Sequence, residues 1–319
     1  MKASRALLTL ILLIGACRAE PDVETSANES GARLDDIAVT PSVTTIEYAI
    51  SFQFLPFESS ATRGLIVELA NLSTRERLSQ RYMAWALGAG GWRTILEDEQ
   101  SEEPTRAPWR IFPSDSLRLT VDADGDPDAL IFSADGEDRV LELGDRLDSW
   151  EDRAGARHAI RQAAFLRHGA RVSGMIIEDR VILPEPDRPA RVGPFERAIV
   201  RSNDGAVLVL FNTREPDRLG DPYAWMYADG LTRRWTAVET RTLEAASSTR
   251  LRRNIPIRIS FRIPEPEIYG ELTAAEREFE QFPAEEGPQA YTGLYRVAGW
   301  IEFGGERRTV EGILERGEP

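Results

Sequence analysis

Cysteine, lysine and histidine are almost absent from this chain of 319 residues, which contains one cysteine, one lysine and two histidines. The single cysteine, Cys17, cannot close an internal disulfide, so packing must hold the fold together. Because Lys2 is the only lysine, every other basic side chain is arginine, and the net charge is −14 at pH 7. This charge argues against nucleic acid and anionic headgroups as partners, since both bind basic surfaces.

The common catalytic and metal-binding motifs are also missing. His158 and His168 lack the spacing and the third ligand of a zinc site, and the sequence has no Gly-x-Ser-x-Gly elbow, phosphate loop or dinucleotide fingerprint. The acidic run 122–126 suggests calcium, but Pro127 and Ser133 stand where an EF-hand loop needs Gly and Glu. An acidic hairpin turn explains the run better. We therefore expect no metal and no cofactor, and we favour a protein that is not an enzyme.

The N-terminus is typical of a secreted protein. Lys2 and Arg5 precede the apolar residues 6–14, and small residues lie directly before Cys17. This pattern predicts a signal peptide over residues 1–16, too short to remain as a membrane-spanning helix. A cysteine directly after the cleavage context resembles the lipobox of bacterial lipoproteins, which implies that Cys17 carries acyl chains and anchors the protein to a membrane.

The segment after the cysteine predicts how the protein is tethered. Residues 17–42 are rich in Ala, Glu, Asp, Ser and Pro and have few large apolar side chains, so we expect a flexible tether. Arg18, in place of Asp after the cysteine, resembles the pattern of lipoproteins sorted to the outer membrane. The predicted location is therefore the bacterial outer membrane, on its periplasmic face.

Two parts of the chain repeat the same skeleton about 141 positions apart. Four pairs keep this offset to within one residue: Asn71 and Asn212, Arg77 and Arg218, Tyr82 and Tyr223, and Trp85 and Trp225. The offset is far longer than a solenoid repeat. We interpret the chain as two copies of one unit, over residues 43–183 and 195–319 with a linker at 184–194, and the paired residues as parts that each copy needs to fold.

Within each copy the pattern predicts strands. Apolar residues alternate with polar ones from Ile46 to Phe54, which is typical of a half-buried strand. Asp-Gly and Gly-Gly pairs between short apolar runs predict hairpins. The exception is the segment 273–281, where Thr273 as N-cap and Glu276 as the second half of a capping box predict a short helix. The expected fold class is all-β, as two barrels or sandwiches.

Aromatic residues on these strands are candidates for a ligand site. Those that could line an apolar cavity are Trp85, Trp225, Tyr227, Trp235 and Trp300. A structural role competes with this interpretation, above all for the two residues that also belong to a repeat pair.

Three segments carry a resemblance to a known family: 161–179, the aromatic hairpin within 206–235, and 291–315. They are similar to the AttH-like proteins and hydroxyneurosporene synthases, also called carotenoid 1,2-hydratases. The resemblance implies two duplicated, antiparallel, calycin-type (lipocalin-like) halves that enclose apolar ligands. For the hydratase members, the resemblance also implies a carboxyl group that stays protonated in an apolar cavity and protonates the alkene before water adds. Where relatives carry an Asp-His-Ser-Trp-like stretch, this chain has Glu178-Asp179-Arg180-Val181, so Asp179 alone is carried over as a catalytic candidate. Its charged neighbours are typical of a solvated strand end.

Three functions remain open from the sequence. The first is an outer-membrane-anchored lipoprotein that binds or carries a hydrophobic small molecule or lipid. The second is a hydratase or isomerase acting on an isoprenoid-like alkene through a buried carboxyl such as Asp179. The third is an envelope protein with filled halves and no ligand cavity, which would recruit a partner through a sheet edge or an apolar patch.

Overall fold

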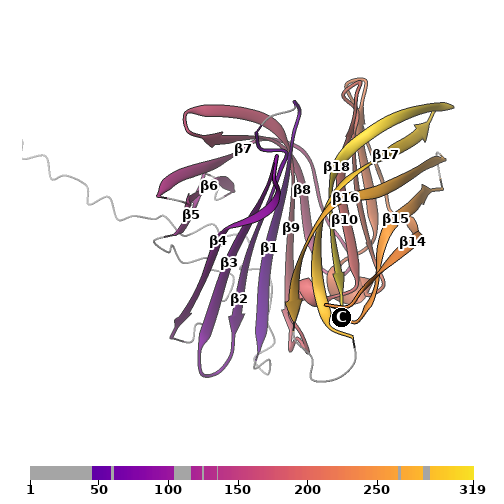
Figure 1. Cartoon of the computed structure of the whole chain (residues 1–319). Coiled ribbons are helices and arrows are strands. Elements are labelled where there is room, and N and C mark those ends of the chain that lie inside the picture. Colours follow the sequence, from indigo (N-terminus) through magenta and orange to yellow (C-terminus); the bar gives the residue numbers. More distant parts are fainter. Residues whose placement is uncertain are drawn as a thin grey trace, which may run out of the picture.

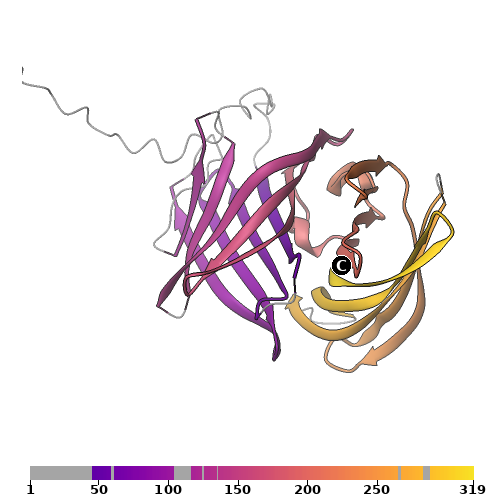
Figure 2. The same cartoon turned by 90° about the horizontal axis from the view of Figure 1, so that it is seen from above.

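The computed structural model describes residues 45–58, 61–103, 116–123, 126–134, 136–264, 267–282 and 288–319. These residues form two nine-stranded antiparallel sheets that lie side by side, one in each half of the chain (Figures 1 and 2). The predicted signal peptide, Cys17 and the predicted tether lie outside the described residues.

The first sheet holds the first nine strands of the chain. They are β1 (Ile46–Pro56), β2 (Gly64–Ser73), β3 (Leu78–Gly88), β4 (Gly91–Glu102), β5 (Leu117–Val121), β6 (Pro127–Ala134), β7 (Glu137–Glu151), β8 (Arg157–Arg167) and β9 (Ala170–Pro184).

The second sheet holds the remaining nine. They are β10 (Phe195–Ser202), β11 (Val207–Thr213), β12 (Tyr223–Ala228), β13 (Leu231–Trp235), β14 (Glu239–Ser248), β15 (Arg253–Ile263), β16 (Ile268–Phe282), β17 (Ala290–Phe303) and β18 (Glu306–Glu318). A 3-10 turn, η1 (Ala190–Val192), lies between the sheets in sequence, and a single turn of helix, α1 (Pro216–Leu219), joins β11 to β12.

Strand order confirms the predicted duplication. In the first sheet the order is β4-β3-β2-β1-β9-β8-β7-β6-β5, and in the second it is β13-β12-β11-β10-β18-β17-β16-β15-β14. In each half the opening strand pairs with both the second strand and the last one, while other neighbours are consecutive hairpins. The all-β, lipocalin-like fold class is therefore correct.

The predicted helix at 273–281 is wrong, because this segment lies inside β16. β17 pairs with β16 from Tyr269 to Phe282, which covers this segment, whereas β15 pairs with β16 only from Ile268 to Thr273. Phe279 also packs edge-on against Tyr291, with ring centroids 5.6 Å apart. Local capping signals are weak beside such tertiary pairing, which overrides intrinsic propensity.

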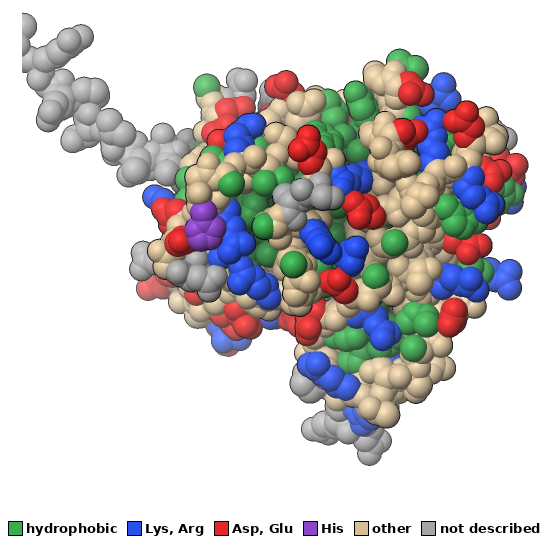
Figure 3. All heavy atoms as spheres, turned by 45° about the horizontal axis from the view of Figure 1, so that its top comes forward, with side chains coloured by type: hydrophobic (Ala, Val, Ile, Leu, Met, Phe, Trp, Pro, Cys, Tyr) green, Lys and Arg blue, Asp and Glu red, His purple; other side chains and the backbone are tan. Residues whose placement is uncertain are grey.

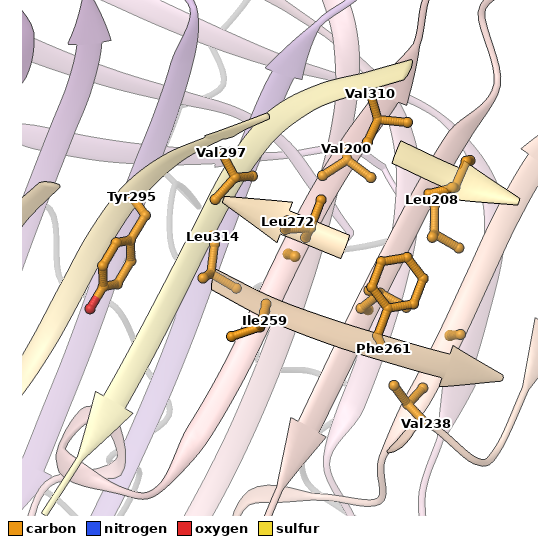
Figure 4. Close-up of a cluster of buried hydrophobic side chains, with 14 of the residues drawn as sticks. Val200, Leu208, Val238, Ile259, Phe261, Leu272, Tyr295, Val297, Val310 and Leu314 are labelled. Atoms are coloured by element: carbon orange, nitrogen blue, oxygen red, sulfur yellow. The ribbon is translucent and has the colours of Figure 1, made fainter. Parts of the chain in front are cut away.

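Each half has its own hydrophobic core on the inner face of its sheet. In the first half the alternating residues Tyr48, Ile50, Phe52 and Phe54 of β1 all lie in this core, as the period of two predicts. Figure 4 shows part of the core of the second half, where Val200, Leu208, Phe261, Tyr295 and Leu314 come from five different strands. Each half therefore carries a buried apolar cluster on the inner face of its sheet.

A third hydrophobic cluster joins the two halves through the opposite faces of the sheets. Ile66, Trp85 and Ile177 of the first half pack in it with Val209 and Trp225 of the second. These residues alternate along their strands with those of the inner cores. Both faces of the central strands are therefore buried, one inside its own half and one against the other half.

The repeat pairs do not all occupy equivalent positions. Tyr82 lies in the inner core of the first half, whereas Tyr223 lies in the cluster between the halves, so the expected equivalence of this pair is wrong. The cause is register: the offset of 141 keeps β2 and β11 in phase, but Trp85 and Trp225, both between the halves, are 140 apart. A shift of one residue moves a side chain to the other face of a strand.

The other two pairs lie at matching places but make different contacts. Asn71 and Asn212 are bonded to the side chains of Gln80 and Thr240. Arg77 and Arg218 both lie between the second and third strands of their halves, where Arg77 is exposed. Arg218 instead donates to the backbone carbonyls of Arg188 and Pro189, at 2.5 and 3.0 Å, and so fixes the linker.

The turns and surface agree with most of the local predictions. Gly205 and Gly230 adopt positive φ between β10 and β11 and between β12 and β13. In the acidic run 122–126, of which Asp124 and Gly125 lie outside the described residues, the backbone N–H of Asp126 donates to Asp122 at 3.0 Å.

Within the described ranges no group of three or more metal-ligating side chains is found, and no helix has the length and apolar character to cross a bilayer.

Candidate functional site

A row of polar side chains crosses the first sheet on the face that meets the second half. Strand pairing places Glu68 opposite Ser51, Ser51 opposite Asp179, Asp179 opposite His158, and His158 opposite Trp150. All five therefore project from the same side of the sheet, one from each of five neighbouring strands. The antiparallel register alone creates this alignment, since the residues are far apart in sequence.

A second row faces it from the other half. There Glu315 lies opposite Arg197, Arg197 opposite Phe211, and Phe211 opposite Tyr223. The Arg197 guanidinium reaches across the interface and donates to Ser51 Oγ at 2.7 Å. The two rows thus meet in one buried cluster, which we call the central network.

His158 lies at one end of the central network between two carboxylates. Its Nδ1 is 2.6 Å from Asp179 and its Nε2 is 3.2 Å from Asp152, which follows the end of β7. Burial lowers the pKa of His158, but the hydrogen bonds to both carboxylates outweigh burial and raise it to about 9. Asp152 also accepts the backbone N–H of Asp221 from the second half at 2.7 Å. His158 is therefore an imidazolium at neutral pH, and its partner Asp152 is bonded to the second half.

Asp179 is the centre of the network. It forms an ion pair with Arg197 at 2.7 Å and accepts the hydroxyl of Tyr223 at 3.1 Å. Burial raises the pKa of Asp179, yet the charges of Arg197 and His158 prevail and hold it below its usual value. The same burial, with the adjacent Asp179 carboxylate, raises the pKa of the Tyr223 hydroxyl well above 10. Asp179 is therefore ionised at neutral pH and is bonded to Arg197, His158 and Tyr223.

The expectation that Asp179 is a solvated strand end is therefore wrong. Its exposed fraction is 3%. The charged neighbours Glu178 and Arg180 point to the opposite side of β9, where they pair with each other inside the first half. The second half covers the face that carries Asp179.

Glu68 and Glu315 form the other end of the network. Gln53 donates to Glu315 at 2.6 Å and Arg197 donates to it at 3.2 Å, while Arg191 pairs with Glu68 at 3.4 Å. Burial and the adjoining Glu315 raise the pKa of Glu68 to about 8, against the opposing effect of Arg191. Glu68 therefore keeps its proton at neutral pH and shares a hydrogen bond with the Glu315 carboxyl.

A small cavity of about 60 Å³ lies beside this carboxyl pair, and we call it the central cavity. Its walls include Glu68, Asp179, Arg197, Phe195 and Phe211. The volume admits water, but it is well below the roughly 300–1,000 Å³ of small-molecule pockets. The central cavity is thus large enough for water molecules but smaller than a typical small-molecule pocket.

A larger space lies between the halves at the end that is uppermost in Figure 1, and we call it the rim groove. It measures about 780 Å³. The residues lining it are Phe57, Glu58, Leu147, Gln162, Met175, Arg201, Ser202, Asn203, Gly205, Val207, Tyr227, Ala298, Thr309, Val310 and Glu311. Phe57, just after β1, is an exposed large hydrophobic residue at 43%. Figure 3 brings this end forward and shows hydrophobic side chains between charged ones where the halves meet.

The five aromatic residues proposed from the sequence as ligand contacts lie in different places. Tyr227 lines the rim groove. Trp85 and Trp225 are packed inside the cluster between the halves, at 4% and 0% exposed. Trp235 packs against the inner core of the second half, and Trp300 is half-buried beneath the Arg307 guanidinium, 3.8 Å from its ring centre. The structure does not bring the five together around one site.

Comparison with solved structures matches this architecture across both halves. An AttH protein of Nitrosomonas europaea superposes with a TM-score of 0.50 at 13% identity, over 85% of this chain and 92% of that one. CghA in its structure with Sch210972 also gives 0.50 at 13% identity, over 86% and 88%. The chain has the AttH-type double lipocalin-like fold. Kievitone hydratase from Nectria haematococca gives 0.49 at 10% identity, over 85% and 88%. No family model and no curated protein sequence matches the chain.

The central network was not predicted from the sequence, although signals for it existed. Glu68 interrupts the apolar run 64–70, and Arg197 stands between Phe195 and Ile199 at the start of β10. A charged residue within an apolar strand is costly unless it is paired, so each predicts a buried partner. The identity of the partner could not be predicted, because it depends on how the halves pack.

Proposed function

We propose that this protein binds a hydrophobic small molecule or lipid in the rim groove. The observation that carries the proposal is the size and lining of the groove, since about 780 Å³ falls within the range of ligand pockets. Leu147, Met175, Val207 and Val310 supply apolar walls, and Phe57 remains exposed at the mouth. An apolar ligand would cover this surface.

The comparisons support binding only through the fold. CghA, which has the same fold, is a protein whose structure was solved with the compound Sch210972. For this chain we propose the rim groove as the binding site, with an unidentified ligand.

Binding is tested with Nile red, a neutral dye that brightens in apolar sites. We expect the protein to enhance its emission and a Phe57→Ala variant to lose most of that enhancement. Leu231→Ala is the matched control, because Leu231 is also exposed, at 63%, but does not line the groove. Equal enhancement by all three proteins would contradict the assignment of the groove, and no enhancement by any would contradict binding itself.

We also propose that acylation of Cys17 anchors the protein to the outer membrane, facing the periplasm. The support is the sequence context of Cys17, which follows a signal-peptide pattern. Metabolic labelling with a clickable fatty acid tests this directly. The wild type should be labelled and recovered with outer-membrane fractions, and Cys17→Ser should be neither. Label on both proteins would contradict the proposal.

A second candidate function is acid-catalysed hydration or isomerisation of an alkene, and one observation favours it. Glu68 is a buried carboxyl that stays protonated at neutral pH, which is what protonation of an alkene requires. The proton donor in this version is Glu68, while Asp179 holds Arg197 and His158 in place. Because the central cavity admits only water, the substrate could reach Glu68 only if the halves moved apart there.

The hydratase candidate is tested by incubating an isoprenoid alkene with the protein in water enriched in ¹⁸O. Labelled alcohol formed by the wild type and lost in Glu68→Gln would support it. An inert wild type, or product formed equally by Glu68→Gln, would contradict it.

A further inference from the structure

One polar pocket opens beside the rim groove and is continuous with it. This pocket measures about 340 Å³, and it shares three lining residues, Glu58, Arg201 and Glu311, with the groove. Its own residues add Arg63 from the start of β2 and Arg296 from β17. We call it the arginine pocket.

The charged side chains of the arginine pocket differ in whether they already have an ion-pair partner. Arg201 pairs with Glu311 at 2.7 Å, and Arg296 pairs with Glu276 of β16 at 3.0 Å. Arg63 is exposed, and its guanidinium forms no ion pair or hydrogen bond with the described part of the chain. Glu58, the remaining acidic residue of the pocket, likewise forms no ion pair there. Within the described residues, Arg63 is therefore the one guanidinium of the pocket without an ion-pair partner, and Glu58 is the one such carboxylate.

Arginine is well suited to one kind of ligand group. Its planar fork of N–H donors matches a carboxylate with two parallel hydrogen bonds. Arg63 still has such donors available, and Arg201, only 14% exposed in its side chain, lies where the pocket meets the apolar groove. A carboxylate placed between them would gain charge-assisted hydrogen bonds, while an apolar chain attached to it would lie in the rim groove.

We propose that the ligand is an amphiphilic carboxylic acid, with its chain along Phe57, Met175 and Val310 in the rim groove and its carboxylate at Arg63 and Arg201. This inference rests on the proposed binding function and adds the class of ligand. Glu58 and Glu311 then exclude ligands with more negative charge than one carboxylate, because these side chains lie against the same head group.

The test compares three competitors of equal chain length for displacement of Nile red from the full chain carrying Cys17→Ser, at pH 8 and low salt. They are dodecanoic acid, dodecanol and dodecylamine. We expect the acid to bind about tenfold more tightly than the alcohol, the scale of one partly exposed charge-assisted hydrogen bond. Added salt should reduce this preference.

Two variants sharpen the test. Arg63→Gln should abolish most of the preference for the acid while leaving the affinity for dodecanol unchanged. Arg307→Gln is the control, because this arginine stacks on Trp300 outside the pocket, and it should leave the preference intact. Equal affinities for acid and alcohol, or tighter binding of the amine, would overturn the assignment of the ligand class and leave the groove standing. Failure of every competitor to displace the dye would overturn the assignment of the groove as well.

Discussion

The central network and the rim groove lie between the same two halves, yet they are built in opposite ways. In the network, Asp179, Arg197 and His158 are buried and each contacts at least two partners. In the groove, apolar side chains border a volume about thirteen times larger, and Phe57 remains exposed. One end of the interface holds the halves together, and the other leaves space for a ligand. Substitutions should separate these roles.

The largest effect is expected from Asp179→Ala. Removing this carboxylate leaves Arg197 and His158 buried without their shared partner, which should cost about 3–5 kcal/mol in the free energy of unfolding. Urea denaturation measures the loss. The control is Asp148→Ala, because Asp148 forms a partly exposed pair with Arg234 at 3.3 Å and should cost less than about 1 kcal/mol. Similar losses for both variants would show that the network does not hold the halves together.

The next largest effect is the pH dependence of the free energy of unfolding that His158 causes. Its pKa rises from 6.5 in the unfolded chain to about 9 in the folded protein, so it binds a proton more tightly when folded. The resulting stabilisation, about 3 kcal/mol, is complete below pH 6.5 and is lost as pH rises through 9. Urea midpoints of the wild type and His158→Gln should therefore converge between pH 6 and pH 10. A difference that stays constant across this range would contradict a charged His158.

Glu68 should also make the free energy of unfolding depend on pH, starting at a lower pH than His158 does. Its pKa is raised above the unfolded value of 4.5, so folding favours the protonated form and stability falls as pH rises from 4.5 to about 8. Replacement by Gln keeps the shape and removes the titration. We expect Glu68→Gln to gain stability relative to the wild type across this window, on the order of 1.4 kcal/mol for each pH unit at most. Parallel stability curves for the two proteins would contradict a protonated Glu68.

The smallest stability effect is expected in the groove. Phe57→Ala removes a side chain that is 43% exposed, so the free energy of unfolding should fall by only about 1 kcal/mol, roughly half of what a fully buried phenylalanine contributes. Ligand binding should nevertheless weaken. Equilibrium unfolding and dye titration of the same preparation test both statements, and a large loss of stability would mean that Phe57 belongs to the packing between the halves.

The difference between the two regions also explains what could be predicted from sequence. The period of two in β1 placed Phe52 and Phe54 inside the first half correctly. The alternate face, with Ser51 and Gln53, read as solvent-facing because nothing in one strand reveals that a second sheet covers it. For the same reason Asp179 was expected to face solvent. The central network and the rim groove could not be predicted, because both depend on how the two halves pack.

The repeat shows a related limit. An offset near 141 correctly predicted duplicated halves, since strand order is the same in both. The offset could not predict which face of a strand each side chain occupies. The offset changes by one residue between β3 and β12, so Tyr223 lies on the face toward the first half, in contact with Asp179. The helix expected at 273–281 failed for a different reason, since the pairing of this segment with β17 outweighs a local capping signal.

The central claim is that an apolar ligand binds in the rim groove between the halves. Photocrosslinking with a dodecanoic acid that carries a diazirine near its chain terminus, followed by peptide mapping, tests this claim at residue level. We predict adducts on peptides containing Phe57, Met175 and Tyr227 that are suppressed by excess dodecanoic acid. Adducts confined to the inner cores of the halves, or labelling that excess acid does not suppress, would contradict it.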